Sequence, residues 1–236
     1  MARTLVQIVQ EARGRLGQPL PSSVIGNTDA GIIQCLGLLN EFLEDLQTRR
    51  MWSLNTMEAT WTATAVEDQG SVDTLFPYGF EGMVEDTFFD RSTMLPIRGS
   101  MNPQEWANRK ARAFSGPLPA FRIRNGHLLM NPPPAVNHVL AVEYFSSYFV
   151  KNGTTLKKVW SADDDVCALD DNLPVAYLKW AWKCAKGLDY AEDFRRYEGL
   201  LESKALRDAR PPQLVMDGPD DNWGPGILVA PGSWNV

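Results

Sequence analysis

The sequence predicts an α+β fold: a helical bundle from the N- and C-terminal helices, a β-rich insert and an extended C-terminal arm. Apolar residues recur at three- and four-residue steps near both ends of the chain, which is the period of an amphipathic helix. Threonine, valine and aromatic residues gather in short runs between turn signals in the middle. The last 26 residues carry five prolines and four glycines, which break helices and most strands.

These patterns divide the chain into three predicted parts. Residues 1–55 and 172–210 form the helical bundle, because their apolar stripes cannot be buried singly. Residues 56–171 form the β-rich insert, which includes a short helix near 103–113. Residues 211–236 form the extended arm.

The N-terminal region predicts two helices. The first covers residues 5–16, and Thr4 is its expected N-cap. The second and longest covers residues 29–51, and either Asn27 or Thr28 is expected to cap it. Its apolar face repeats over several turns, so we expect it to override the two glycines within it.

The middle of the chain changes to a strand pattern. Residues 56–64 are rich in threonine around a central tryptophan and predict a strand. The stretch 78–90 is ambiguous. Asn102 followed by Pro103 and Glu105 is typical of a helix start with a capping box, and the helix that follows is short.

A β meander follows. Residues 120–124 and 127–130 predict two strands joined by a tight Asn125-Gly126 turn. Residues 139–148 predict a long third strand, which begins beyond a proline-rich turn.

Helical periodicity then returns. Asn172 is the expected cap of a helix whose apolar stripe runs to Leu188, and a second helix or a continuation ends near Arg210. Trp180 and Trp182 lie two residues apart, so a helix points them to different sides. One can lie in the core, and the other needs a second surface, which makes Trp182 an interface candidate.

The arm combines a broken backbone with large apolar side chains. Disordered tails are usually poor in such residues, because exposing them to water is unfavourable. We therefore predict that the arm lies on another surface; the alternative is that it folds back over its own domain. The candidate interface residues in the arm are Trp223, Ile227, Leu228, Val229 and Trp234.

Composition restricts the class of protein. Hydrophobic residues make up 44% and charged residues 22%, as in ordinary globular domains. The formal net charge of −6 argues against an electrostatic nucleic-acid binder, which needs clustered lysine and arginine. No run of apolar residues is long enough to span a membrane, and we expect no secretory signal. The three cysteines, Cys35, Cys167 and Cys184, are expected to be free buried thiols in a reducing compartment.

The sequence contains no motif of a nucleotide, zinc-protease or serine-hydrolase site, so we expect no catalytic residue, cofactor or metal. His127 and His138 lack a local partner for nucleophilic catalysis. The acidic residues at 163–165 and 170–171 could bind a hard cation, but they lack the spacing of a calcium loop. We expect them to cap a helix and shape a loop, and we expect little change in stability on replacing Asp163–Asp165 with asparagine.

Several short motifs follow the predicted elements in a characteristic order: Arg49-Arg50-Met51-Trp52, Phe76-Pro77-Tyr78-Gly79-Phe80, Glu105-Trp106, Phe121-Arg122-Ile123, Pro132-Pro133-Pro134, Val142-Glu143-Tyr144-Phe145 and Leu173-Pro174. Together with the acidic segment and the helix around Trp180, this order resembles the head–tail adaptor (connector) proteins of tailed bacteriophages. The resemblance is to the tail tubular protein A-like group of short-tailed phages, and it covers most of residues 1–210.

The resemblance implies a structural role without enzymatic activity. Such adaptors form a ring, typically of twelve subunits, beneath the portal protein. They retain the packaged DNA and present a platform for the nozzle or tail tube, and extended arms reach onto neighbours or the portal. DNA passes through the channel without specific binding, which an acidic protein suits. The expected location is the head–tail junction of the virion, after assembly in the host cytoplasm.

Two other functions remain open on the residues alone. A small hydrolase could use a carboxylate pair in the β-rich insert, such as Glu81 with Glu85 or Asp86. A carbohydrate-binding module could use exposed tryptophans.

Overall fold

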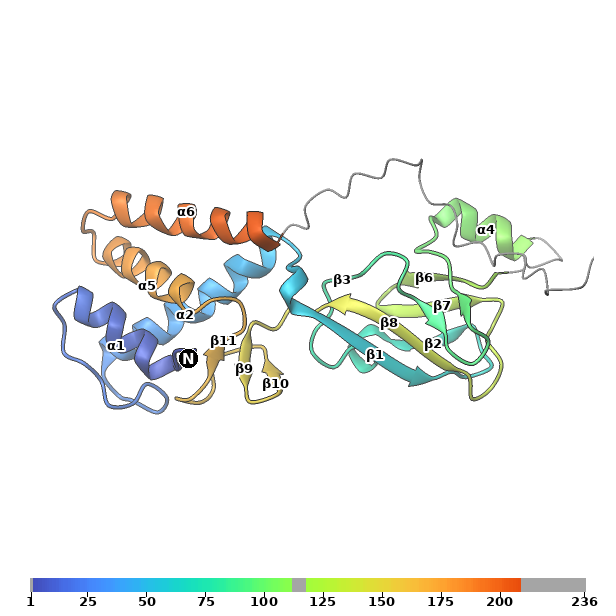
Figure 1. Cartoon of the computed structure of the whole chain (residues 1–236), viewed down its shortest axis with the longest axis horizontal. Helices are drawn as coiled ribbons and strands as arrows, with labels where there is room; N and C mark the ends of the chain where they lie inside the picture. The colour runs from blue at the N-terminus through green and yellow to red at the C-terminus, as the bar shows by residue number, and fades with distance from the viewer. Residues whose placement is uncertain (1, 112–117, 209–236) are drawn as a thin grey trace, which may run out of the picture.

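The structure is a computed structural model that describes residues 2–111 and 118–208. Figure 1 shows two parts side by side along the long axis of the molecule. The helical part contains α1, α2, α5 and α6 together with the small strands β9–β11. The β-rich part contains β1–β8 with the helices α3 and α4. The predicted α+β class, with helices from both ends of the chain around a β-rich middle, is confirmed.

The two N-terminal helices begin with clear caps. α1 spans Leu5–Arg15, and the predicted N-cap Thr4 forms a capping box with Gln7. α2 spans Ala30–Arg49, and its N-cap is Asp29, whose carboxylate accepts a hydrogen bond from Gly31 N at 2.7 Å. The prediction of Asn27 or Thr28 as the cap is therefore wrong. Asn27 instead accepts from Asp29 N at 2.9 Å and forms the turn before the helix.

The C-terminal helices are α5 (Asn172–Ala185) and α6 (Ala191–Asp208). Asn172 is the first helical residue of α5, and the N-cap position belongs to Asp171, so the predicted cap is wrong by one residue. The carboxylate of Asp170 accepts from Asn172 N at 2.7 Å and supplies the capping hydrogen bond.

One hydrophobic cluster joins all four long helices, which confirms the predicted bundle. At its centre the Tyr177 ring lies 5.3 Å from both the Phe42 and the Tyr197 ring centroids. A small sheet also contributes to this cluster; its strands are β9 (Val150–Asn152), β10 (Thr155–Lys157) and β11 (Val166–Cys167). The strands contribute the buried side chains of Val150 and Cys167 to the cluster, and the neighbouring segments contribute those of Phe149 and Trp160.

The larger sheet of the β-rich part is built on β8 (Val139–Phe145), a central strand. β1 (Thr56–Thr62) pairs with one edge of β8, and β3 (Gly82–Met83) and β4 (Phe89–Asp90) pair with the other; β5 (Leu95–Pro96) follows β4. The strand predicted over 139–148 ends at Phe145, because Ser146 turns the chain: its N–H bonds to Asn55 O and its hydroxyl accepts from Tyr148 N.

The second sheet has the order β2 (Asp68–Ser71), β7 (His127–Asn131), β6 (Ala120–Arg124). The predicted turn at Asn125-Gly126 is confirmed, and both residues have positive φ, as a tight hairpin of this kind requires. The inner faces of the two sheets enclose a second hydrophobic cluster, which runs from Ala59 to Tyr144.

Two short helices border the β-rich part. α3 (Val72–Leu75) follows β2 directly, and α4 (Pro103–Ala111) begins with the predicted capping box. Asn102 accepts from Glu105 N at 2.8 Å, and Glu105 accepts from Asn102 N at 3.3 Å.

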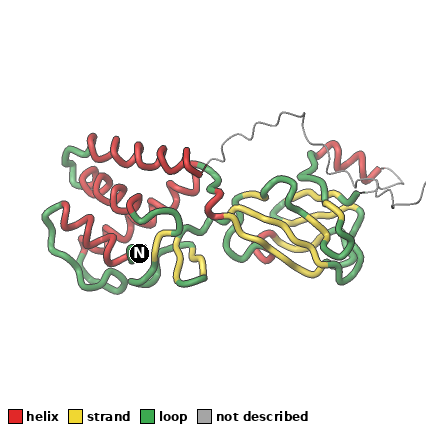
Figure 2. The backbone as a smooth tube through the Cα atoms, viewed as in Figure 1, coloured by secondary structure: helices red, strands yellow, loops and turns green. Residues whose placement is uncertain are grey.

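A short joint connects the two parts (Figure 2). It contains the 3₁₀ turn Ser53–Asn55 and the return segment after β8. The buried Asn55 amide donates to the carbonyls of Ser146 and Tyr148, at 2.7 and 2.9 Å. The two segments that cross between the parts are thus tied to each other.

Candidate interaction surfaces

The end of α6 is tied to the same joint. The nearly inaccessible carboxylate of Asp208 accepts from Ser53 N, Ser53 Oγ and Leu54 N, at 2.9, 2.6 and 3.0 Å. Burial acts to raise the pKa of this carboxyl, but these hydrogen bonds and the nearby Arg50 hold it below its ordinary value. Asp208, the last residue that the structure describes, is therefore held at the joint.

Five of the six predicted interface residues lie outside the described residues: Trp223, Ile227, Leu228, Val229 and Trp234. The sixth, Trp182, is partly buried against the helical cluster, and the Lys186 ammonium lies 5.8 Å from the centroid of its ring. Trp180 is also partly buried, and the centroid of its ring lies 5.1 Å from that of Phe194. Both tryptophans therefore contact the helical core.

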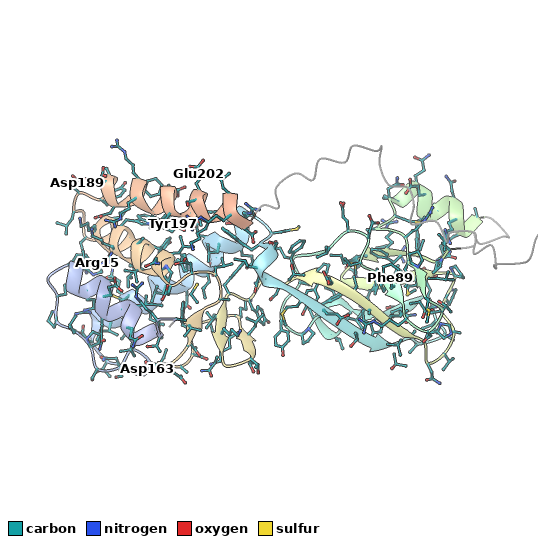
Figure 3. All side chains as sticks on the ribbon, in the orientation of Figure 1. Arg15, Phe89, Asp163, Asp189, Tyr197 and Glu202 are labelled. Carbon is teal, nitrogen blue, oxygen red and sulfur yellow. The ribbon has the colours of Figure 1, made fainter. Side chains whose placement is uncertain are left out.

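Exposed apolar side chains lie in the turn between α5 and α6 and at the start of α6, where Tyr190 and Phe194 contact Trp180. Leu188, Tyr190 and Phe194 are 50%, 41% and 37% exposed. Asp189, in the same turn, lies at the end of the molecule farthest from the β-rich part (Figure 3). Apolar groups exposed together on a soluble protein often mark a contact surface, so this end of the bundle is one candidate surface.

A second candidate is a cavity in the β-rich part, which we call the aromatic slot. It has a volume of about 540 Å³. The buried side chains of Phe88, Ile97 and Phe121 form its floor, and the partly buried Phe80, Met83 and Ile123 form its walls. The lining residues come from three separate stretches of the sequence, 80–88, 97–100 and 121–123, so no local pattern could have predicted the slot.

The rim of the aromatic slot is polar and exposed. It includes the carboxylates of Glu85 and Asp86 and the residues Gly99 and Ser100, all of which are exposed. Gly99 has a φ of +149°, and a Cβ there would lie 2.5 Å from Phe121 O. Glycine is thus required where the rim passes the floor of the slot.

The carboxylates proposed for a hydrolase do not form one site. Glu81 accepts a hydrogen bond from Gln47 Nε2 at 3.0 Å beside the joint and is not part of the slot, whereas Glu85 and Asp86 lie on its rim. The geometry of a glycosidase pair facing across a substrate cleft is not supported by these contacts.

Both histidines pair with carboxylates. His127 Nδ1 lies 2.9 Å from Asp68, and His138 Nδ1 lies 2.6 Å from Asp90. Among the described residues, neither ring is hydrogen-bonded to a serine, threonine or cysteine side chain that could act as a nucleophile. Burial acts to raise the pKa of the Asp90 carboxyl, but hydrogen bonds from His138 and the following turn lower it below its usual range.

The acidic segment shapes a loop. Asp163 accepts from Val24 N and Ile25 N, at 2.9 and 2.8 Å, and so ties the α1–α2 connection to this loop. Asp165 has a fully buried carboxylate and accepts from Ser161 N, Ala162 N and Lys157 Nζ. Within residues 2–111 and 118–208, no group of three or more histidine, cysteine or acidic residues is arranged to hold a metal ion.

The cysteines differ from each other. Cys35 and Cys167 are buried free thiols, as predicted, and burial raises the pKa of Cys167 to about 11. Cys184 is exposed on the last turn of α5, so the prediction that all three are buried is wrong. In the part of the chain that the structure describes, no helix is both long and apolar enough to cross a membrane.

Comparison with known proteins identifies the family of this chain. Residues 3–226 match the sequence model of the family described as SU10 adaptor protein. The match spans the helical part, the β-rich part and part of the C-terminal segment, so the chain belongs to this family of phage adaptor proteins, a structural component of the virion. No curated protein matches the chain.

Proposed function

Since this chain is a phage adaptor protein, we propose that it forms a ring, typically of twelve copies, that docks under the portal protein. The ring helps to retain the packaged DNA and is the platform for the nozzle or tail tube. Within the adaptors, we place it in the tail tubular protein A-like group of short-tailed phages. The observation that carries the proposal is the family match, which continues through both parts of the fold.

The charge of the chain supports a channel through which DNA passes without specific binding. Its formal net charge is −6 and its isoelectric point is about 5.0. Tight binding to the phosphate backbone would need clustered cations that displace counterions. An acidic ring therefore lets DNA pass and does not hold it by binding. We propose that the packaged DNA is retained because the channel is closed.

Subunit contacts are proposed at two places. The exposed apolar end of the helical part, next to Trp180, provides a surface for the portal or a neighbouring copy, and Trp182 on the same helix is a further interface residue. The C-terminal segment supplies Trp223, Ile227, Leu228, Val229 and Trp234 as anchors on a neighbour or the portal. A large side chain buried at an interface can contribute roughly 2 kcal/mol or more, and repetition around a ring multiplies the effect.

Assembly on the portal tests the function. The full chain is mixed with purified portal rings of the same phage and viewed by electron microscopy. We expect an added ring of density beneath the portal, and the free chain is to be assayed for enzymatic activity in parallel. A 26.4 kDa monomer that ignores the portal and turns over a substrate would contradict the proposal.

A further inference from the structure

We propose that the aromatic slot is the receptor for Trp234 from the C-terminal segment of a neighbouring copy in the ring. This inference rests on the proposed function for the presence of that neighbour. The recognised group is an indole side chain, apolar in its body and carrying one N–H donor.

The chemistry of the slot fits an indole. Three phenylalanines, Phe80, Phe88 and Phe121, line it and offer ring faces and edges for aromatic contacts. The carboxylates of Glu85 and Asp86 stand at the rim, where an indole N–H would emerge from the apolar floor. A volume of about 540 Å³ is within the ~300–1,000 Å³ typical of ligand pockets.

The neighbouring side-chain charges favour Trp234 over the other tryptophan of the segment. Trp223 follows directly after Asp220, Asp221 and Asn222, and these acidic groups would meet the two carboxylates of the rim. Like charges brought together at an interface are unfavourable. Trp234 lies between Ser233 and Asn235, which are neutral, and Gly232 gives the backbone freedom to turn toward the slot.

The length of the segment allows it to reach a neighbouring copy, and the choice of a neighbour as the donor rests on the ring of the proposed function. The segment starts at the joint, where Asp208 holds Ser53. The slot of the same copy begins close by, because a Cβ on Gly82 would lie 2.8 Å from Met51 Cε. Trp234 follows Asp208 by 26 residues, which span up to roughly 90 Å when extended, far more than its own slot requires.

A binding measurement tests the slot without assembly. The receptor is the full chain with Trp234→Ala, which removes its own ligand, and the probe is a fluorescein-labelled peptide of residues 225–236 followed by fluorescence anisotropy. We expect at least tenfold weaker binding when the peptide carries Trp234→Ala or the receptor carries Ile123→Trp, which fills the slot. The control receptor Ile33→Trp makes the same change at an exposed site of α2 and should bind normally. Equal binding by all receptors, each verified as folded, would overturn the proposal.

Crosslinking in the assembled ring identifies the donor. In a Cys184→Ser background, one preparation carries Ser100→Cys on the rim and another carries Ser233→Cys beside Trp234; the two are mixed before assembly. A short bismaleimide should give a dimer-sized product, and replacing Ser100→Cys with Ser22→Cys, at an exposed site of the helical part, should abolish it.

The two proposals can fail separately. Rings that form on the portal but give no Ser100–Ser233 product would overturn the slot assignment and leave the adaptor function intact. A third preparation carries both Ser100→Cys and Ser233→Cys in one chain. A crosslink that forms only within that chain, and not between the two mixed preparations, would also overturn the assignment. Absence of rings would contradict the proposed function, while peptide binding would still decide whether the slot accepts Trp234.

Discussion

The helical part and the β-rich part bury their cores in different ways. The helical core combines residues from Leu5 to Leu201, drawn from both ends of the described chain and from the small sheet near Val150. The β-rich core lies within one continuous stretch, from Ala59 to Tyr144. The helical part therefore depends on contacts that are distant in sequence, whereas the β-rich part is an insertion with its own core.

The hydrophobic core that each residue joins shows where the boundary between the two parts lies. Phe149, Val150 and Trp160 pack with the helices, although they lie in the segment 56–171 that the sequence assigns to the β-rich insert. We propose that the insertion ends near Ser146, where the chain turns at the joint, and that residues beyond it fold with the helices.

Deleting residues 1–50 should have the largest effect. The deletion removes α1 and α2, and with them about half of the helical core, so the helical part should lose cooperative unfolding. Residues 56–145 expressed alone should keep a cooperative transition, because their core is continuous in sequence. Circular dichroism on heating measures both. A cooperative helical melt in the truncated chain would refute the interdependence of the helices.

Single core substitutions should act on one part at a time. Leu39 in α2 and Leu140 in β8 are both fully buried, so Leu39→Ala and Leu140→Ala should each cost about 2–5 kcal/mol. Hydrogen exchange should show the loss mainly in the part that holds the substitution. Leu206→Ala, at an exposed position of α6, is the control and should stay within about 0.5 kcal/mol. Uniform loss across both parts would indicate a single cooperative unit.

Local signals in the sequence were sufficient for elements that short-range contacts determine. The capping boxes at Thr4 and Asn102, the Asn125-Gly126 hairpin and the amphipathic helices all follow from neighbours within four residues. The short strands β3 and β4 exist through pairing with β8, so the stretch 78–90 stayed ambiguous. Tertiary pairing decides such segments, because their own propensity is weak.

The candidate surfaces were less predictable than the fold. The apolar content of the C-terminal segment is visible in the sequence, and that segment lies outside the described residues. The aromatic slot depends on the spacing of two sheets, which no run of residues encodes. The role of Asp165 was also hidden: the sequence shows three adjacent aspartates, and only the fold shows which one is buried.

Asp165→Asn should destabilise the helical part by about 2 kcal/mol, because it removes the charge that pairs with Lys157 inside a buried hydrogen-bonded loop. The burial of the Asp165 carboxylate therefore revises the expectation that all three aspartates can be replaced with little effect. Asp164→Asn, at the exposed neighbouring position, is the matched control and should change stability by less than about 0.5 kcal/mol. Chemical denaturation measures the difference, and equal effects would contradict the assignment.

The pH dependence of stability gives a second test of the role of Asp165. Burial acts to raise the pKa of Asp165, but hydrogen bonds from Lys157 and the loop hold it below its ordinary value. A depressed pKa in the folded state stabilises the fold above the unfolded-state pKa of about 3.9, and that stability is lost as the pH falls through the folded-state value. Asp165→Asn should therefore lose less stability than the native chain between neutral pH and about pH 3.

Asp208→Asn should have the smallest effect, about 1 kcal/mol, because it weakens hydrogen bonds that cap a short turn at the joint. Thermal unfolding measures the change, and Glu202→Gln at an exposed position of α6 is the control. An effect as large as that of Leu39→Ala would mean that the joint is part of the helical core.

Incorporation of a truncated chain onto portal rings tests the central claim most directly. The claim is that residues 2–208 carry the fold and residues 211–236 carry contacts of the assembly. A chain that ends at Arg210 should melt within a few degrees of the full chain, because both hydrophobic clusters lie before Asp208. Its incorporation, counted by electron microscopy against the full chain, should fall at least tenfold. Undiminished incorporation, or a melting temperature lowered by many degrees, would contradict the account.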